Sequence, residues 1–348
     1  KYVPIGNKSL VKLDMPNLLG GVSMFDVLNR SINFPQFNED MEPLVNEYQN
    51  AIQIVEPDLI IVPGSSLTSY FLFKAAKREG KLNRTIHSYA GIMEKEIGGY
   101  HGEPRAILGM VGRSFTIPEA LDNVTYVFPS DLVRSTLEVE HGIKFSNYHI
   151  LPNGVSSELF EEDLPRKVPS ELSLGFVGRL HHVKNARFFL DLSDNLKEKA
   201  KLKIITDLRG VASKTDGPSL LDKLTNGDVE YCHPRPIKDL NDFYRTEVSA
   251  VVIPSLFETF CNVALESVAC GTPSLLSSRA GVSDIYREYG LENLIFSITD
   301  LDSFHSALEY AKEMNFVVDP KIVEAIRNDF SWEKIVQRFD TITQSVVA

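Results

Sequence analysis

Two glutamates in one short segment are well placed to bind a polar ligand. Glu258 follows an apolar run, and seven residues separate it from Glu266. A helix that starts near Asn262 would put Glu266 about one turn inside it, so both carboxylates can face one opening. The amides of Phe260, Cys261 and Asn262 would be the unpaired donors of that helix start. Such a set can bind a sugar diphosphate, although each glutamate alone fits an ordinary surface or helix-dipole position better.

A second group of polar residues follows the apolar run Leu174–Val177. It starts with Gly178, and it contains Arg179 and Lys184 before a helical pattern that begins at Asn185. Glycine lets a phosphate approach the backbone, while arginine offers a forked cation and lysine a point cation to a diphosphate. A turn with two solvent-exposed cations explains the same residues equally well when they are taken alone.

The elements that must position these residues alternate between strands and helices. Short apolar runs that end in Pro or Gly indicate buried parallel strands at Leu59–Val62, Leu174–Val177 and Ala250–Ile253. Helical periodicity marks Met41–Val55, Asn185–Leu196, Ile237–Tyr244 and Asn262–Cys270. This order is typical of doubly wound α/β domains, which bind ligands beyond the carboxyl ends of their strands.

The length of 348 residues favours two domains. The alternation breaks between residues 152 and 170, where prolines and a charged run cluster, so we place the connection between domains there. We therefore expect a first domain at 1–151 and a second at 152–328. A last helix at 329–348, with Trp332, would pack back on the first domain.

The charge balance argues against some classes of partner. With 47 acidic and 36 basic residues the net charge is -11, which disfavours a surface built to coat nucleic acid or an anionic membrane. One local basic group is better explained as a solvated helix face than as a membrane contact, and it comprises Lys74, Lys77, Arg78, Lys81 and Arg84.

The cysteines and the hydropathy pattern suggest a compartment. Cys232, Cys261 and Cys270 lie in or beside apolar runs without metal-ligand spacing, so we expect buried, reduced thiols. No window approaches the ~18 consecutive apolar residues of a membrane span. We therefore expect a soluble, cytoplasmic protein.

Together these segments resemble the donor-site signature of retaining GT-B glycosyltransferases, above all glycosyltransferase family four, the glycosyl transferases group 1. The segment from Pro254 to Pro273, with both glutamates, carries the main resemblance. Residues 152–155 resemble the hinge of the family, and residues 178–185 resemble its phosphate-binding strand end. The resemblance covers about residues 85–340.

The resemblance implies a GT-B fold, with two Rossmann-like doubly wound domains that face a cleft. The first domain looks incomplete at its amino end, because Gly20 and Gly21 are the only candidates for its opening turn, so we expect residues upstream of Lys1. The implied reaction transfers a hexose from a UDP or GDP sugar, with retention of configuration. The implied acceptor is a hydroxyl of a glycan, a lipid-linked sugar or a small molecule, as in polysaccharide biosynthesis.

The resemblance also implies roles for single residues. Arg179 and Lys184 would hold the donor diphosphate, and Glu266 would hold the ribose. The amides of residues 260–262 would contact the sugar and phosphate.

Two side chains would be catalytic. Glu258 would contact the donor sugar near its reacting face, and His87 would reach that sugar from the first domain when the domains close. Two positions depart from the family pattern: Ser88 stands where aspartate is frequent, and Cys261 stands where glycine is usual. We expect the cysteine to narrow the space near the sugar.

We expect no metal and no other cofactor. No Asp-x-Asp pair follows a strand where a divalent ion could bridge the diphosphate, and Asp300 and Asp302 are better explained as caps of the next helix. Two other classes stay open: a GT-B-fold phosphorylase or epimerase, and a catalytically idle protein that binds a nucleotide sugar. Arg235 could lie near the nucleobase, but an exposed turn arginine fits its position better.

Overall fold

The structure is a computed structural model that describes residues 2–5, 8–11, 34–64, 67–92, 95, 122–160, 165–196, 199–209 and 217–348. The chain forms two compact units: Lys1–Tyr126 with Val346–Ala348, and Val127–Ser345. The domain limits expected from the sequence, 1–151 and 152–328, remain a prediction. The expected opening turn at Gly20 and Gly21 lies outside the described residues.

The first unit contains strands that follow buried apolar runs. Its described elements are β1 (Tyr2–Ile5), β2 (Lys8–Val11), α2 (Phe34–Val55), β3 (Ile60–Pro63), α3 (Leu67–Arg78), the 3-10 turn Leu82–Arg84, β4 (Thr85–Ser88) and β5 (Thr125–Phe128). Strands β3 and β4 pair in parallel in a sheet of order β3-β4-β5-β6, where β6 is Tyr148–Ile150. The expected strand Leu59–Val62 is present with its limits shifted by one residue, and its Val62 is fully buried.

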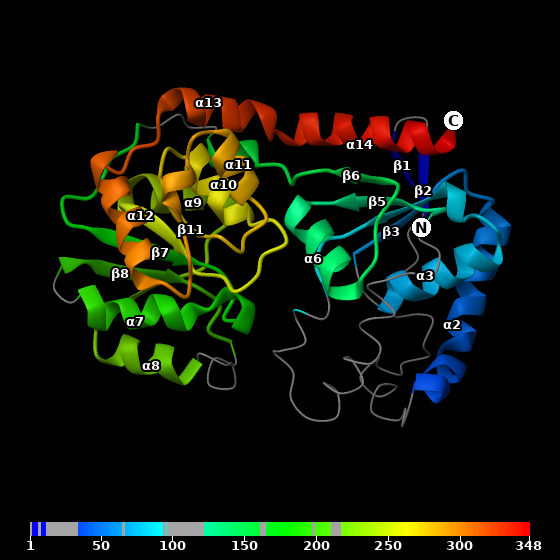
Figure 1. The fold of residues 1–348 in the computed structure, drawn as a ribbon, viewed down its shortest axis with the longest axis horizontal. Helices are drawn as coiled ribbons and strands as arrows, with labels where there is room; N and C mark the ends of the chain where they lie inside the picture. The colour runs from blue at the N-terminus through cyan, green and yellow to red at the C-terminus, as the bar shows by residue number, and fades with distance from the viewer. Residues whose placement is uncertain are drawn as a thin grey trace. The chain divides into compact units, whose positions relative to one another are not determined.

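The second unit is built on a parallel six-stranded sheet of order β12-β11-β10-β7-β8-β9. Its strands are β7 (Ser173–Val177), β8 (Lys201–Ile205), β9 (Glu230–Cys232), β10 (Ala250–Ile253), β11 (Ser274–Ser277) and β12 (Ile295–Phe296). Its helices are α6 (Asp131–His141), α7 (Ala186–Leu196), α8 (Gly217–Thr225), α9 (Ile237–Asp242), α10 (Asn262–Ala269), α11 (Ser283–Glu288), α12 (Leu301–Glu313), α13 (Pro320–Asp329) and α14 (Trp332–Val347). Figure 1 shows α7 and α8 on one side of this sheet and α9 and α10 on the other. This is the doubly wound arrangement expected from the sequence.

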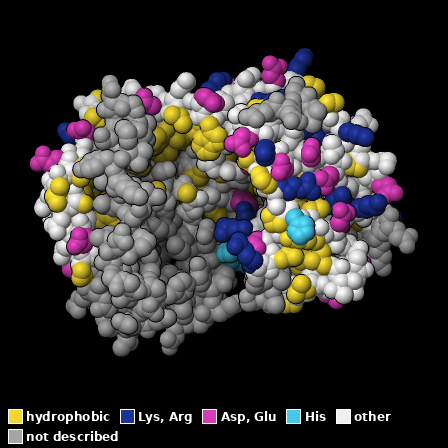
Figure 2. Space-filling view, turned by 180° about the vertical axis from the view of Figure 1, so that it is seen from behind, with side chains coloured by type: hydrophobic (Ala, Val, Ile, Leu, Met, Phe, Trp, Pro, Cys, Tyr) yellow, Lys and Arg dark blue, Asp and Glu magenta, His cyan; other side chains and the backbone are white. Residues whose placement is uncertain are grey.

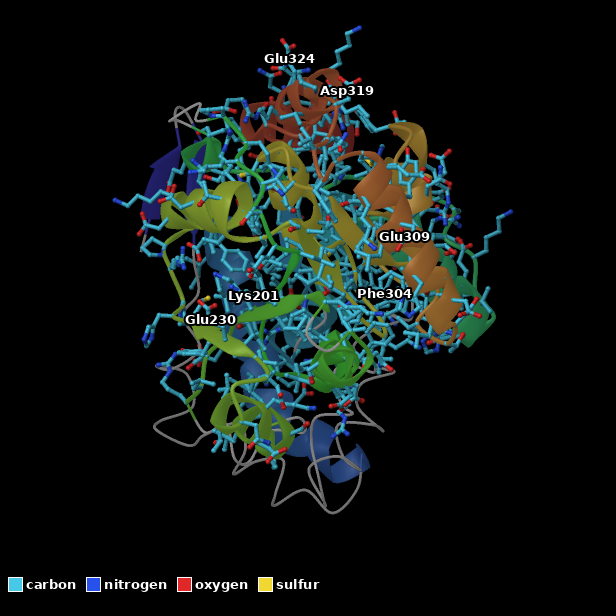
Figure 3. All side chains as sticks on the ribbon, turned by 90° about the vertical axis from the view of Figure 1, so that its left-hand side faces the viewer. Lys201, Glu230, Phe304, Glu309, Asp319 and Glu324 are labelled. Atoms are coloured by element: carbon cyan, nitrogen blue, oxygen red, sulfur yellow. The ribbon has the colours of Figure 1, made fainter. Side chains whose placement is uncertain are left out.

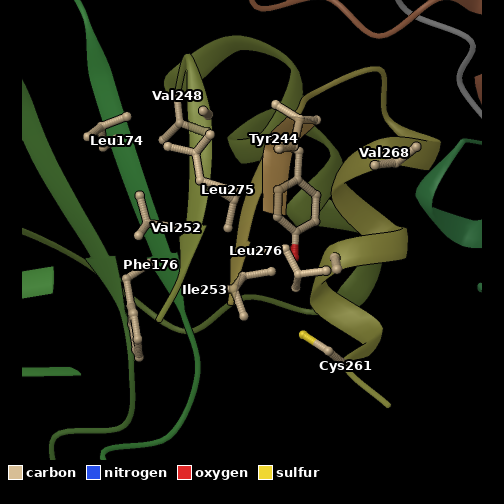
Figure 4. Close-up of a cluster of buried hydrophobic side chains, with 14 of the residues drawn as sticks. Leu174, Phe176, Tyr244, Val248, Val252, Ile253, Cys261, Val268, Leu275 and Leu276 are labelled. Carbon is tan, nitrogen blue, oxygen red and sulfur yellow. The ribbon is translucent and has the colours of Figure 1, made fainter. Parts of the chain in front are cut away.

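The core of the second unit lies on both faces of this sheet. On one face, Phe304 of α12 makes edge contacts with Phe188 of α7 and with Phe296 of β12 (Figure 3). On the other, Tyr244 lies between Leu275 and Val268 (Figure 4). Burial on both faces explains why these strands read as continuous apolar runs rather than as alternating ones.

One expected helix ends differently. The pattern predicts a helix over Ile237–Tyr244, but α9 ends at Asp242 and a π-helical turn, Phe243–Glu247, follows it. Arg166 supports this turn, because its five guanidinium N–H groups all donate to backbone carbonyls. The acceptors lie 2.6 to 3.1 Å away, at Tyr244, Arg245, Val248, Ser249 and Phe316. A tertiary contact from the connecting segment therefore shapes the end of this helix.

The charged surface agrees with the sequence analysis. Arg78 pairs with Glu42 at 2.5 Å, and Arg84 lies 3.9 Å from Asp58, so part of the basic group on and after α3 has acidic partners. Figure 2 shows Lys and Arg side chains interleaved with Asp and Glu over the described part of one face. Within the described ranges, no helix combines the length and the hydropathy that a membrane crossing requires.

Candidate functional site

The strand order places a topological switch point between β7 and β10. The chain runs from β7 to β8 and β9 on one side, and from β10 to β11 and β12 on the other. Open α/β sheets bind ligands beyond the carboxyl ends of their strands at such a point. Residues 178–185 follow β7 and residues 254–261 follow β10, so the two predicted clusters meet where the topology favours a ligand.

Backbone and side-chain hydrogen bonds join these two loops. The Leu256 N–H donates to the Val183 carbonyl at 2.7 Å, and the Asn185 amide Nδ2 donates to the Pro254 carbonyl at 3.0 Å. Asn185 has a φ of 51°, a left-handed conformation that asparagine tolerates better than most residues. The loop after β7 therefore has a fixed position against the loop after β10.

The structure brings Lys184 and Glu258 together. The Lys184 Nζ lies 2.5 Å from the Glu258 Oε1, and the Ser255 hydroxyl donates to the same oxygen at 3.0 Å. The two charged side chains are 24% and 11% exposed, so the pair is partly shielded from water. Arg179 is exposed in the same loop, and no ion pair or hydrogen bond holds its side chain within the described part of the chain.

Backbone pairing fixes Glu258. Its N–H donates to the Arg279 carbonyl at 3.1 Å, and its carbonyl accepts from the Gly281 N–H at 3.0 Å. A side chain at position 281 would collide with the Thr259 carbonyl and the Ser130 hydroxyl, which are themselves hydrogen-bonded at 2.6 Å. Glycine is therefore required at 281 for this close approach.

The start of α10 presents free amide groups, as predicted. The N–H groups of Phe260, Cys261 and Asn262 have no hydrogen-bond acceptor among the described residues. Cys261 has a φ of 96°, a conformation that is rare for residues other than glycine. Its sulfur points toward Ile253 in the hydrophobic core (Figure 4). The side chain is buried, and the expectation that it narrows the space near a sugar remains a prediction.

Glu266 lies one turn inside α10 and contacts a residue that the sequence analysis missed. The Tyr244 hydroxyl donates to the Glu266 Oε2 at 3.2 Å. Burial raises the pKa of Glu266 above its ordinary value, and the hydrogen bond from Tyr244 opposes this shift. Burial also raises the pKa of Tyr244, so its hydroxyl stays a donor.

Glu258 and Glu266 both affect the pKa of the Cys261 thiol. Burial raises the pKa of the Cys261 thiol, the negative charges of Glu258 and Glu266 raise it further, and the positive charge of Lys184 lowers it. Both carboxylates are therefore close enough to the turn at Cys261 to affect it electrostatically. The expectation that both carboxylates face one opening remains a prediction.

His87 lies in the interior of the first unit. It is 2% exposed, its Nε2 is 2.9 Å from the Gly64 carbonyl oxygen, and its ring stacks on Tyr89 with a centroid distance of 4.4 Å. Burial lowers its pKa to about 4, which keeps the imidazole neutral. Its Nδ1 has no hydrogen-bond partner among the described residues. The predicted contact of His87 with a sugar remains a prediction.

Arg235, Asp300 and the three cysteines also have contacts or burial that bear on their predicted roles. Arg235 forms a forked pair with Glu247, at 2.5 and 3.1 Å, which accounts for its charge without a nucleobase. The Asp300 carboxylate accepts from the N–H groups of Asp302 and Ser303, which confirms Asp300 as a helix cap. The three cysteines are buried free thiols, as expected. Among the described residues no three His, Cys, Asp or Glu side chains cluster as a metal site would require.

Some site residues had weak sequence signals. Ser255 stands three positions before Glu258, a spacing that a tight loop could have suggested. Asn153 donates to the Asn262 Oδ1 at 2.9 Å from a distant segment, and Tyr244 reaches Glu266 from the π-helical turn. Nothing local in the sequence reveals these last two contacts, because both depend on how separate segments pack.

A large part of the second unit matches a known protein family. Residues 171–312 match the family model described as glycosyl transferases group 1. A D-inositol 3-phosphate glycosyltransferase of Nocardiopsis dassonvillei is 27% identical over 226 residues, which cover 60% of this chain and 51% of the relative. The chain thus spans about half the length of the first curated relatives it matches.

Solved structures match over nearly the whole chain. A UDP-forming alpha,alpha-trehalose-phosphate synthase from Burkholderia vietnamiensis superimposes with a TM-score of 0.67 at 14% identity, covering 100% of this chain and 88% of that one. HepE from Anabaena, solved in complex with UDP, matches with a TM-score of 0.63 at 12% identity, covering 87% and 82%. At these identities the likeness concerns the fold. The chain therefore has the GT-B fold, and its residues 171–312 are similar to the glycosyl transferases group 1 family.

Proposed function

We propose that this protein is a glycosyltransferase that moves a hexose from a nucleoside diphosphate sugar to a hydroxyl acceptor with retention of configuration. The observation that carries the proposal is the position of Lys184, Glu258 and the free amides of residues 260–262 at one switch point. Cations and helix N-termini stabilise a diphosphate, and a carboxylate beside them can accept hydrogen bonds from sugar hydroxyls. The match of residues 171–312 to the glycosyl transferases group 1 model supports the same reaction class.

Each residue has a role in the proposed reaction. Lys184 and Arg179 stabilise the negative charge that develops on the diphosphate as the sugar leaves. Glu258 positions the sugar, and Glu266 holds the ribose. His87 approaches the sugar when the domains close around the substrates and exclude water.

UDP is the first nucleotide to test. The Anabaena protein was solved with UDP, and the Burkholderia enzyme is described as UDP-forming. GDP is the second nucleotide in this proposal. The acceptor is a hydroxyl of a glycan, a lipid-linked sugar or a small molecule, because relatives include a D-inositol 3-phosphate glycosyltransferase and a lipopolysaccharide 1,2-N-acetylglucosaminetransferase. We further propose that transfer needs no metal or other cofactor and takes place in the cytoplasm.

The test is sugar transfer followed by nuclear magnetic resonance. UDP-glucose and GDP-mannose are each incubated with the protein and an acceptor panel, and the new anomeric signal is compared with that of the donor. We expect a product of the same configuration, and a large loss of transfer in Glu258→Ala. Turnover with phosphate or with no second sugar would indicate a phosphorylase or an epimerase instead. Binding without transfer or hydrolysis would indicate an idle binding protein.

A further inference from the structure

The carboxylate of Glu266 is held by a tyrosine whose own position is strongly constrained. Tyr244 is fully buried, and its hydroxyl is 3.2 Å from the Glu266 Oε2. Figure 4 shows its ring packed between Leu275 and Val268, with the hydroxyl directed toward the Cys261 end of α10. A ring fixed on both sides has little freedom to follow a moving carboxylate.

The backbone of Tyr244 is fixed as well. Its carbonyl accepts two hydrogen bonds, from the Arg166 Nη1 and from the Thr272 hydroxyl, both at 2.6 Å. The residue lies in the π-helical turn Phe243–Glu247, and such turns occur frequently at functional sites. A regular α-helical turn would rotate the side chain away from its present direction, because each residue would advance by a different angle.

We infer that Tyr244 is a positioning residue for donor binding, which orients the Glu266 carboxylate so that it accepts hydrogen bonds from the two ribose hydroxyls of the nucleotide. This inference rests on the proposed function. The Glu266 Oε2 accepts from Tyr244, and no donor among the described residues bonds to the other carboxylate oxygen. A vicinal diol presents two donors, which a carboxylate of fixed orientation binds better than a freely rotating one.

The electrostatic surroundings of Glu266 give the inference a pH signature. Burial favours the protonated acid, and Tyr244 favours the carboxylate. The other titratable groups that interact with Glu266 are the buried thiols of Cys261 and Cys270, and Arg245 and Arg327 act on Cys270. Because the charged form of Glu266 accepts from the diol, nucleotide affinity falls as pH falls through its pKa. Removal of the tyrosine hydroxyl raises that pKa, so the loss of affinity begins at a higher pH.

The test is a calorimetric titration of the full chain with UDP and with 2′,3′-dideoxy-UDP, which lacks both hydroxyls. The variant is Tyr244→Phe. The matched control is Tyr286→Phe, since Tyr286 is equally buried and its hydroxyl contacts Ser274 and the Ala264 carbonyl rather than Glu266. We expect Tyr244→Phe to weaken UDP binding about fivefold and dideoxy-UDP binding less than twofold. Tyr286→Phe should change neither.

A double-mutant cycle separates the loss of carboxylate orientation from a general loss of packing around the tyrosine. In a Glu266→Gln background, which keeps the side-chain volume, Tyr244→Phe should cause no further loss of UDP affinity. Equal losses for both nucleotides, or a full additional loss in the Glu266→Gln background, would show a purely structural tyrosine and overturn the inference. A wild-type chain that binds neither UDP nor GDP would instead overturn the proposed function.

Discussion

Substitution of Glu258 by glutamine should have opposite effects on nucleotide binding and on sugar transfer. In the structure Lys184 already forms an ion pair, because its Nζ is 2.5 Å from the Glu258 Oε1. A diphosphate must compete with this carboxylate for the lysine. Glutamine keeps an oxygen that can accept from Ser255, but it removes the charge that holds Lys184. The variant should therefore bind free UDP more tightly while it transfers sugar more slowly.

The expected gain in UDP affinity can be worked out from the exposure of the Lys184–Glu258 ion pair. The two side chains are 24% and 11% exposed, so water and salt screen much of their attraction. The bare Coulomb energy of two charges at 4 Å and an effective dielectric constant of about 20 is ~4 kcal/mol, but measured net values for partly exposed pairs are about 1 kcal/mol. Release of Lys184 should therefore lower the Kd for UDP about fivefold at low salt.

The assay is calorimetric titration of UDP into wild type, Glu258→Gln and a control that changes the net charge equally. Glu309→Gln is a suitable control, because Glu309 pairs with Lys312 at 2.6 Å on the exposed face of α12. We expect tighter UDP binding in Glu258→Gln alone, with a smaller gain at high salt. Unchanged or weaker binding in Glu258→Gln would refute the idea that Lys184 passes from this carboxylate to the diphosphate.

Further predictions concern the loop, the first unit and the metal requirement. Gly281→Ala should displace the Thr259 carbonyl and lower transfer without preventing expression, which circular dichroism and an activity assay can check; full activity would contradict the tight packing at this glycine. His87 has a folded pKa of about 4, below its unfolded value near 6.5, so its stabilising contribution is present above pH 6.5 and is lost as pH falls toward 4. Between pH 6.5 and 5 the free energy of unfolding should fall by about 2 kcal/mol through this group. Amide exchange in β4 should report this fall in the wild type and should not report it in His87→Phe. Transfer should persist in excess chelator, and an absolute need for magnesium would disprove metal independence.

The sequence predicts much of the second unit because its signals are local. The run Ala250–Ile253 is bounded by Pro254, and β10 has these same limits. The start of α10 at Asn262 was likewise expected, and with it the free amides at this helix start. Strand ends and helix starts depend on nearby residues, so periodicity and turn residues suffice to place them.

Other features of the site depend on contacts between distant segments. The π-helical turn at Phe243–Glu247 is supported by Arg166, which lies more than seventy residues earlier in the chain. The contact of Tyr244 with Glu266 and the inward direction of the Cys261 sulfur arise from the same packing. No periodic pattern encodes which side chain a buried tyrosine will reach, so these contacts became visible only in the structure.

The central claim is that a nucleoside diphosphate binds at the switch point of the second unit. Hydrogen–deuterium exchange of the chain with and without saturating UDP, or GDP if UDP does not bind, tests this claim most directly. We predict slower exchange in peptides covering residues 178–185 and 258–266, and no change in α3. Protection that is confined to other segments, or no protection with either nucleotide, would contradict the assignment of the donor site.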